Sequence, residues 1–489
     1  RMQNVGKATY HQWMRSCWRE NVSYFRTVPA GSYPMQYSDP TLTWDRDPAL
    51  QDFKSEWISR GTGYIGATRG FLVPSYMDYV VWYHREQLRH GLRGIYLDDM
   101  FPMTCRNPDT AMRQDDEGKW HGNLGIFEMR ELVRRLSVMQ HQMGVTPRLL
   151  QVHMTNCLLV PCFAFATSTI SWEDHYGEDV FQERFPLDYV RTESLGTQVG
   201  CESVALDGIY RGTWDWDDWR YGRFAFLTRT QLAVMLPLGV KPARRPQRAF
   251  AGYDADTLYA AYGVLGRFRI WEKGCRFVPC FEDDGAIAGA PDGVLVASWR
   301  RNGEVIAVFG NQDGRDKAFS PKVDFAALGL PPTARAFDAE TDEPLPTGEI
   351  RLVGWDYALV RYATSVPAPQ GERIDLSSGW VTNAAHTAGG ALYRTQGFAV
   401  KPGDKVRFTL NAKGRGAWSV GLYQYQDEQK GGWRGANLAH RVARSPERAC
   451  RAKAEFVIPD GVRFVRPALV VGKNADVTFD VLRMEVVRK

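Results

Sequence analysis

The sequence predicts an α/β protein: a TIM-like (β/α) barrel followed by a small antiparallel β-domain and a C-terminal β-sandwich of jelly-roll type. Two observations carry this prediction. Up to about residue 271, short apolar strands alternate with amphipathic helices, as in a barrel or a doubly wound sheet. Beyond Cys280, short alternating strands are separated by Gly, Asn, Pro and Asp, which is typical of antiparallel sheets.

Length and composition indicate about three domains. A chain of 489 residues is too long for a single core, and we expect domains at residues 1–272, 273–365 and 366–489. The composition, 44% hydrophobic and 24% charged, is that of a globular protein. No apolar run approaches the roughly 18 residues of a membrane helix, so no transmembrane segment is expected. The eight cysteines are too few for a dense disulfide framework, and mostly buried thiols are expected.

Six strands and four helices are expected in the barrel, in alternating order. The strands are Ser23–Val28, Gly63–Ala67, Gly94–Leu97, Leu149–His153, Thr169–Trp172 and Glu202–Leu206. The helices are Tyr76–His90, Ile126–Met143, Phe224–Leu236 and Asp256–Ile270. In the second helix Phe127, Met129, Leu132, Leu136 and Met139 recur at helical spacing. Because a complete barrel has eight strands, an early strand is expected upstream of Arg1, and the barrel is predicted to be truncated at its N-terminus.

The two β-rich regions are joined by a linker at Thr364–Gly371, which contains Pro367 and Pro369. Before it, strands are expected at Val294–Trp299, Val305–Phe309, Ala334–Asp338 and Tyr357–Tyr362. After it, the sandwich strands include Lys405–Leu410, Trp418–Tyr425, Ala454–Ile458 and Val477–Val487.

Charge is unevenly distributed between the two halves. Residues 371–489 hold 20 Lys and Arg against 11 Asp and Glu, a balance of +9, which leaves −4 for the rest of the chain. A basic terminal domain is compatible with a polyanionic partner, but a solvated surface that happens to be basic is the favoured interpretation.

The dipeptide Asp98-Asp99 is the first candidate for catalysis. It ends the expected strand Gly94–Leu97, and the carboxyl ends of barrel strands are where catalytic groups collect. Two adjacent carboxylates repel, which raises one pKa and leaves the other low, as acid/base chemistry requires. The structural alternative is that one Asp braces the following loop.

Residues at other expected strand ends are candidate substrate contacts. They are Arg69, His153, Asn156, Trp172, Glu173, Asp174, Trp214, Asp215 and Trp216. Aromatic rings can stack on sugar faces, while acids, amides and imidazole can bind hydroxyl groups. Three of them also have a purely structural interpretation: His153 as a hydrogen-bonded core histidine, Trp172 as a core residue and Asp174 as a helix cap.

Other functional signatures are absent from the sequence. It contains no Walker loop, no H-E-x-x-H and no G-x-S-x-G, and its nine histidines form no zinc pattern. The match to G-x-G-x-x-G at Gly61–Gly66 does not follow a predicted strand. No nucleic-acid motif is present either. We therefore expect no cofactor, no metal and no nucleic-acid partner.

At several of these positions the chain resembles the catalytic domain of glycoside hydrolase family 123. The resemblance spans roughly Val22 to Trp271 and rests on Gly94–Asp99, Asn107-Pro108, Lys119, Phe127–Met143, Val152–Met154 and Trp172–Asp174. It implies a TIM-like barrel that cleaves β-linked N-acetylgalactosamine. That family uses an adjacent Asp-Glu pair, whose Asp orients the substrate's acetamide nucleophile while Glu acts as general acid/base. Here Asp98 matches the Asp, and the shorter Asp99 replaces the Glu.

The C-terminal region resembles a carbohydrate-binding module of jelly-roll type. The resemblance is carried by Val400–Asp404, Ser419–Tyr423, Arg466–Val470 and Phe479-Asp480. It implies either a sugar-binding domain or a purely structural support.

The leading hypothesis is a retaining glycoside hydrolase acting on an oligosaccharide or polysaccharide, in a secreted, periplasmic or cell-surface location. Asp98 would position or attack at the anomeric centre, and Asp99 would be the acid/base. In a variant, either Asp is the nucleophile and Glu173 or Asp174 the acid; a carboxyl separation of about 5 to 5.5 Å would support it. The alternatives are a non-catalytic glycan-binding protein that keeps the barrel as a scaffold, and a surface protein whose basic sandwich binds anionic polymers.

Overall fold

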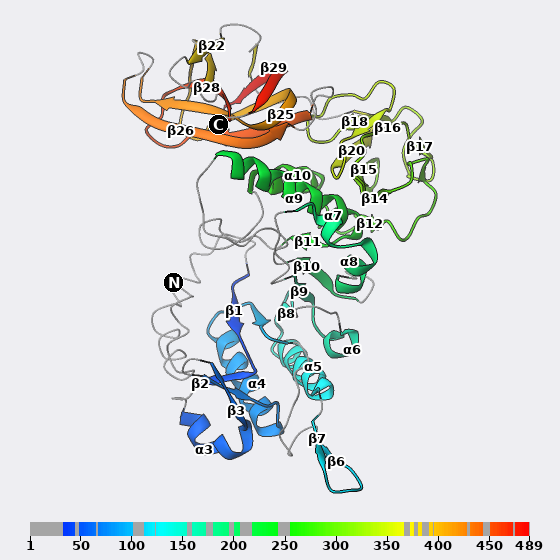
Figure 1. Ribbon diagram of the computed structural model, residues 1–489, viewed down its shortest axis with the longest axis vertical. Coiled ribbons are helices and arrows are strands. Elements are labelled where there is room, and N and C mark those ends of the chain that lie inside the picture. Colours follow the sequence, from blue (N-terminus) through cyan, green and yellow to red (C-terminus); the bar gives the residue numbers. More distant parts are fainter. Residues whose placement is uncertain are drawn as a thin grey trace. The chain divides into compact units, whose positions relative to one another are not determined.

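The computed structural model divides the chain into two compact units (Figure 1). Unit 1 is Arg1–Asp174 with Asp188–Leu206, and unit 2 is His175–Leu187 with Asp207–Lys489. The residues described are 33–44, 48–64, 67–100, 112–122, 124–153, 159–172, 179–194, 200–205, 218–242, 255–365, 372–375, 380–383, 391–394, 396–427, 431–443, 450–472 and 475–488. The predicted strand Ser23–Val28 lies outside them.

Five strands of unit 1 pair in parallel, in the order β1-β5-β8-β9-β10. They are β1 (Met35–Ser38), β5 (Gly94–Leu97), β8 (Leu150–His153), β9 (Ser168–Ser171) and β10 (Glu202–Ala205). Four of them confirm predicted strands, and β1 was not predicted. An α/β unit with a parallel sheet is thereby established, while closure into a barrel stays a prediction.

The two faces of this sheet differ in polarity. Ile95 and Leu97 of β5, with Leu150 and Val152 of β8, belong to a buried apolar core. That core also contains residues of two helices, α4 (Pro74–Arg89) and α5 (Ile126–Gln142), which confirm the predicted ones. Because side chains alternate along a strand, Tyr96 and the residue after Leu97 point to the opposite face. The helices thus cover one face and leave the polar side chains on the other.

The predicted strand Gly63–Ala67 is wrong. The chain there forms an antiparallel sheet of β2 (Leu42–Trp44), β4 (Ala67–Gly70) and β3 (Ile58–Tyr64), in that order. The expected strand therefore straddles the connection between β3 and β4. The Gly-rich run in this stretch carried no apolar alternation that could mark the turn.

The remaining elements of the parallel half are short, apart from one helix. The helices are α3 (Pro48–Trp57), α6 (Val160–Phe163) and α8 (Leu187–Glu193), and the strands are β6 (Arg113–Gln114) and β7 (Trp120–His121). The short helix α7 (Phe181–Arg184) belongs to unit 2.

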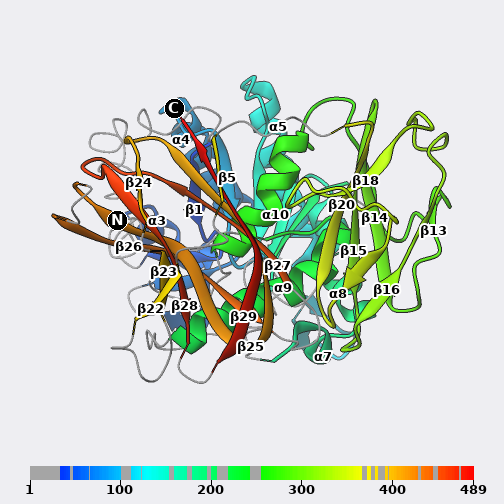
Figure 2. The same cartoon turned by 90° about the horizontal axis from the view of Figure 1, so that it is seen from above.

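Unit 2 begins with two helices against an antiparallel sheet. The helices α9 (Asp218–Leu238) and α10 (Ala255–Phe268) contain the predicted ones, apart from the last two residues of the second, and β11 (Lys241–Pro242) lies between them. The sheet order is β12-β14-β15-β20-β18, with strands Arg276–Val278, Val294–Arg301, Glu304–Asn311, Tyr357–Ala363 and Arg335–Asp338 (Figure 2). Two small pairs accompany it: β13 (Ile287–Ala288) with β17 (Lys322–Val323), and β16 (Lys317–Phe319) with β19 (Ile350–Leu352).

Alternation along β15 explains why this sheet is buried on both faces. Ile306 and Val308 pack into a core with α9 and α10, while Val305, Ala307 and Phe309 pack into a second core on the other face. The period of two along one strand thus supplies both cores. This sheet confirms the predicted antiparallel strands, while the bounds of the expected domain, residues 273–365, stay a prediction.

The C-terminal part of unit 2 is a β-sandwich built around one long strand, β25 (Lys405–Tyr425). Its first half pairs with β27 (Cys450–Val457) and β29 (Asp476–Val487), and its second half with β26 (Trp433–Ala443) and β28 (Phe464–Val471). Residues of both halves share one apolar core. The other strands are β21 (Glu372–Asp375), β22 (Trp380–Asn383), β23 (Ala391–Arg394) and β24 (Phe398–Ala399).

Candidate functional site at the carboxyl edge of the parallel sheet

Three polar residues align at the ends of three neighbouring strands. The register pairs Ser38 of β1 with Leu97 of β5, and Leu97 with Val152 of β8. The next residue along each strand is therefore Asp39, Asp98 and His153, respectively. These three residues form a row across the carboxyl edge of the sheet, where parallel α/β folds bind their ligands.

Asp98 and His153 are joined by a short hydrogen bond. Nδ1 of His153 lies 2.5 Å from Oδ1 of Asp98, and the side chains are only 5% and 14% exposed. The Tyr96 hydroxyl is 3.1 Å from the same nitrogen, and its ring stacks on the imidazole with centroids 6.3 Å apart. The backbone N–H of Met100 donates to the carbonyl of His153 at 2.9 Å, which ties the loop after β5 to the end of β8. Nδ1 of the imidazole is thus contacted by Asp98 and by the Tyr96 hydroxyl, and one face of the ring by the Tyr96 ring.

Asp39 is the acid with the most perturbed environment. Burial raises its pKa most, the charges of Asp99 and then Asp98 add to the effect, and together they bring the pKa to about 7. Two donors of Thr41 oppose this: the backbone N–H at 2.8 Å and the hydroxyl at 2.7 Å, both to Oδ1 of Asp39. Near neutral pH this carboxyl group is therefore divided between its protonated and ionised forms.

Asp99, two residues past the end of β5, lies in the left-handed backbone region, with φ of 53°. Aspartate tolerates this region better than most residues. Consecutive residues of an extended strand face opposite sides, but the left-handed turn at Asp99 breaks that alternation. Its charge acts on Asp39 more strongly than that of Asp98, so both acids of the dipeptide influence the same carboxyl group.

Trp172 also has a left-handed backbone, with φ of 75°, directly after β9. Its side chain is fully buried, its indole N–H donates to Oγ of Ser194 at 2.6 Å, and its ring meets that of Tyr189 edge-on. In this structure the indole packs inside unit 1 and exposes no face for stacking. Its contact with a substrate stays a prediction.

The other predicted contacts lie largely beyond what the structure describes. Asn156, Glu173, Asp174, Trp214, Asp215 and Trp216 are outside the described residues. Arg69 lies in β4, where only its backbone is described. Of the predicted site residues, the structure brings together Asp98, Asp99 and His153.

Two kinds of site residue escaped the sequence reasoning. Asp39 and Tyr96 are the first kind; the pattern Tyr37-Ser38-Asp39-Pro40 repeats the strand-then-Asp signal of β5 and could have revealed Asp39. The second is a pair of candidate substrate contacts with exposed rings: Trp120 (48% exposed) in β7, on the connection from β5 to α5, and Phe127 (78%) in the first turn of α5. Connections that leave the carboxyl ends of parallel strands build the binding surface of such folds.

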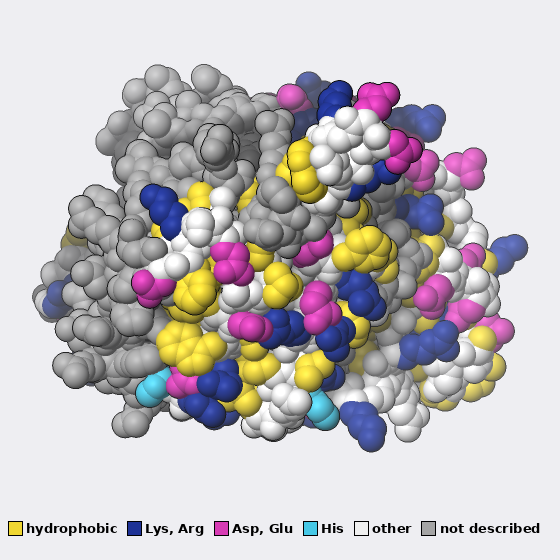
Figure 3. All heavy atoms as spheres, turned by 90° about the horizontal axis from the view of Figure 1, so that it is seen from below, with side chains coloured by type: hydrophobic (Ala, Val, Ile, Leu, Met, Phe, Trp, Pro, Cys, Tyr) yellow, Lys and Arg dark blue, Asp and Glu magenta, His cyan; other side chains and the backbone are white. Residues whose placement is uncertain are grey.

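One face of the molecule carries charged side chains of both signs. Figure 3 shows described acidic and basic side chains interspersed with hydrophobic ones on one face of the molecule.

Among the described residues, no three His, Cys, Asp or Glu side chains are grouped so that they could hold a metal ion. No helix in the described ranges is long and apolar enough to cross a membrane. Among the described cysteines, Cys201 and Cys275 carry free thiols.

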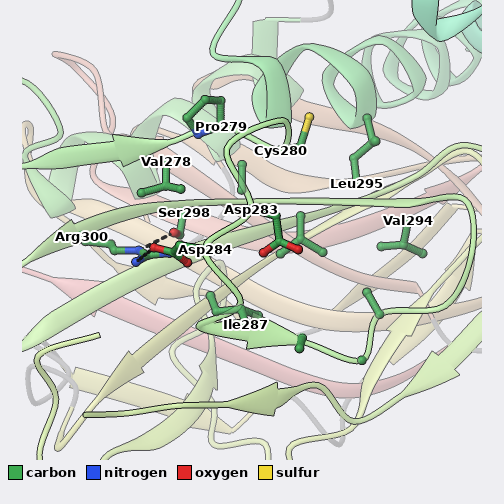
Figure 4. A pocket seen from close by; sticks show the side chains of 15 residues that line it. Val278, Pro279, Cys280, Asp283, Asp284, Ile287, Val294, Leu295, Ser298 and Arg300 are labelled. Carbon is green, nitrogen blue, oxygen red and sulfur yellow. Dashed lines mark hydrogen bonds and ion pairs between the residues drawn. The ribbon is translucent and has the colours of Figure 1, made fainter. Parts of the chain in front are cut away.

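A separate pocket of about 270 Å³ lies in unit 2, between the loop after β12, β13 and the start of β14 (Figure 4). In it, Arg300 donates to both carboxylate oxygens of Asp284, at 2.5 and 2.9 Å, and these hydrogen bonds lower the pKa of Asp284. Asp283 accepts from the backbone N–H of Gly285 at 2.9 Å. An acid held ionised in this way is a poor proton donor, unlike Asp39.

Comparisons with known proteins give only remote likeness. No family model and no curated protein matches the chain. Among solved structures, the isomalto-dextranase of Arthrobacter globiformis T6 in complex with panose has a TM-score of 0.38 at 12% identity, covering 92% of this chain and 81% of that one. An α-amylase from Lactobacillus plantarum has a TM-score of 0.43 at 11% identity, covering 68% and 78%. Likeness of this degree establishes neither family nor activity.

Proposed function

We propose that the chain is a glycoside hydrolase whose active site is the carboxyl edge of the parallel sheet, with Asp98 and Asp99 as its central carboxylates. The observation that carries this proposal is the row of Asp39, Asp98 and His153 beside Asp99. Three acids and an imidazole converge where α/β folds place their chemistry. Acids whose environments differ in this way are what hydrolysis of a glycosidic bond uses.

The contacts of Asp98 favour a positioning role. Its hydrogen bond to His153 fixes both groups, and Tyr96 holds the imidazole from the side. A fixed Asp98 would orient a polar group of the substrate, such as the acetamide expected for β-linked N-acetylgalactosamine. Asp99 would place its carboxylate near the anomeric carbon, where positive charge develops in the transition state.

The exposed rings of Trp120 and Phe127 support a carbohydrate as substrate. An exposed aromatic ring has a flat apolar face that can stack on a sugar ring. Trp120 lies on the connection that follows β5, the strand before Asp98, and Phe127 lies in the first turn of the next helix, α5. We propose that they form part of the sugar-binding surface, together with the predicted contacts Trp172, Glu173, Asp174, Trp214, Asp215 and Trp216.

The proposal extends to the rest of the chain. Residues 1–272 would form the barrel, residues 273–365 its antiparallel partner, and residues 366–489 a module that binds or supports binding of a polysaccharide. A secreted, periplasmic or cell-surface location would give access to such a substrate.

Hydrolysis of aryl glycosides, starting with the β-N-acetylgalactosaminide, tests the proposed function. Wild type, Asp98→Asn and Asp99→Asn are compared with Asp52→Asn, which changes an exposed acid on α3. We expect wild type and the Asp52 variant to cleave equally, and each site variant to lose about 10²-fold or more in kcat/KM. A wild-type protein that binds glycans but cleaves none of them would instead be a glycan-binding protein.

A further inference from the structure

We propose that Asp39 is the carboxyl group that transfers the proton in this hydrolysis, the role that the sequence suggested for Asp99. The inference rests on the proposed function and deepens it, because it assigns the general acid/base to a strand that the sequence did not reveal.

The position of Asp39 places it in the same row as the other site residues. It follows β1, one residue beyond the Ser38–Leu97 pair, so its neighbour across the sheet is Asp98. The backbone N–H of Asp98 donates to the carbonyl of Ser38 at 2.7 Å, which continues the pairing of the two strands to this level. The pairing of β1 with β5 therefore places Asp39 beside Asp98 at the carboxyl edge of the sheet.

The contacts of Asp39 define which of its oxygens can carry a proton. Both donors of Thr41 bind Oδ1, at 2.8 and 2.7 Å. An oxygen that accepts two hydrogen bonds keeps its lone pairs occupied, so the proton of the neutral acid belongs on Oδ2. Thr41 thus fixes the carboxyl plane and sets the direction in which the proton is delivered.

The charges around Asp39 match a proton-transferring group. Burial raises its pKa most, the charges of Asp99 and Asp98 just past β5 raise it further, to about 7, and the hydrogen bonds from Thr41 lower it. Asp98 is engaged in turn with His153 of β8. A general acid works best with a pKa near the working pH, because it is then available in both protonation states.

The reaction balances with water as the only other reactant. The proton on Asp39 passes to the glycosidic oxygen while the bond from that oxygen to the anomeric carbon breaks, and its electron pair leaves with the alcohol. A nucleophile, either Asp99 or the substrate's acetamide, takes up the anomeric carbon. Water then displaces the nucleophile and gives one proton to the Asp39 carboxylate, which restores the acid.

Kinetics with two leaving groups test this role. Wild type, Asp39→Asn and Asp52→Asn are assayed on an alkyl glycoside, whose leaving group needs a proton, and on a dinitrophenyl glycoside, whose leaving group departs without one. For Asp39→Asn we expect a loss of about 10²-fold or more in kcat/KM on the alkyl glycoside, and less than tenfold in the bond-breaking step on the dinitrophenyl glycoside. In the pH profile of kcat/KM, the limb near pH 7 should be absent from the Asp39→Asn variant.

A second variant separates chemistry from structural support. Thr41→Val removes the hydroxyl donor that favours the ionised form, so the limb should move to higher pH rather than disappear. Equal losses of Asp39→Asn on both substrates, or an unchanged pH limb, would overturn the inference while leaving the proposed function intact. If wild type cleaves neither substrate, the proposed function itself fails, and this inference with it.

Discussion

Asp99 and Trp172 follow two strands of the parallel sheet, β5 and β9, with the same unusual backbone, φ of 53° and 75°. Asp99 is the second residue past β5 and Trp172 the first past β9, so each turns the chain sharply close to the end of its strand. Non-glycine residues in this region carry strain of the order of 1 kcal/mol, which the surroundings must offset. For Trp172 the offset comes from burial of the ring and the hydrogen bond to Ser194.

Replacing Trp172 with Phe should therefore destabilise the protein. The change removes the indole N–H that Ser194 accepts and leaves a small void, so the free energy of unfolding should fall by about 1–3 kcal/mol. Urea unfolding measures it. Trp120→Phe is the matched control, because that ring is 48% exposed and should change stability by about 0.5 kcal/mol or less. Equal effects of the two substitutions would contradict a supporting role for Trp172.

The strand β25 depends on two of its glycines. It passes from one sheet of the sandwich to the other at Gly414 and Gly416, with φ of 129° and 115°. A Cβ atom at Gly414 would lie 1.8 Å from the carbonyl oxygen of Asp476, on the paired strand β29. The bend thus requires both an unusual backbone and the absence of a side chain.

Gly414→Ala should consequently cost far more stability than another glycine substitution with similar φ. Gly435 in β26 is the control: its φ is 108°, but a Cβ atom there would meet nothing within 4 Å. We expect about 1–2 kcal/mol for Gly435→Ala from backbone strain alone, and at least about 3 kcal/mol for Gly414→Ala. Thermal unfolding of the two variants decides; similar melting temperatures would show that the strands at Gly414 can separate without penalty.

Sequence patterns predicted the elements that carry strong periodicity. The helix α5 was predicted at its correct start because apolar residues recur at helical spacing from Ile126. The strand β5 was found because four apolar or small residues precede two acids. By contrast, β1 is four residues long and reads Met-Gln-Tyr-Ser, so neither hydrophobicity nor length distinguishes it from a loop. Its partner β5 lies about sixty residues away, and only tertiary pairing makes it a strand.

The candidate site was predictable to the same extent. Asp98 and Asp99 follow a recognisable strand and were identified, whereas Asp39 depends on the strand that was missed. The hydrogen bond between His153 and Asp98 joins residues 55 positions apart, and the sequence alone does not show that they lie close together in space. Burial of Trp172 is likewise a property of packing, since an aromatic residue after a strand can point inward or outward.

For the molecule as a whole, two buried groups of unit 1 should give opposite pH dependence of stability. The pKa of Asp39 is raised by burial to about 7, so the folded state binds a proton that the unfolded state releases above about pH 4, and stability falls as pH rises to 7. The pKa of His84, fully buried in α4, is lowered by burial to about 4, so stability falls as pH drops below about 6.5. Between pH 4 and 6.5 the two effects oppose each other.

Two variants should tilt this balance in opposite directions. Asp39→Asn removes the first effect and leaves stability rising with pH up to about 6.5, while His84→Asn leaves it falling over the same range. Each slope is at most about 1.4 kcal/mol per pH unit, and partial exposure of Asp39 makes its slope smaller. Melting temperatures of wild type and both variants from pH 4 to 8 provide the measurement. Parallel curves for all three proteins would exclude these groups as the cause.

The long strand β25 has a further consequence for how the sandwich comes apart. Its first half is an integral member of one sheet and its second half of the other, without a loop between them. Because β25 belongs to both sheets, unfolding of one sheet disturbs the other. The two sheets should therefore unfold together rather than one after the other. The two layers are therefore linked covalently through β25, in addition to packing against each other.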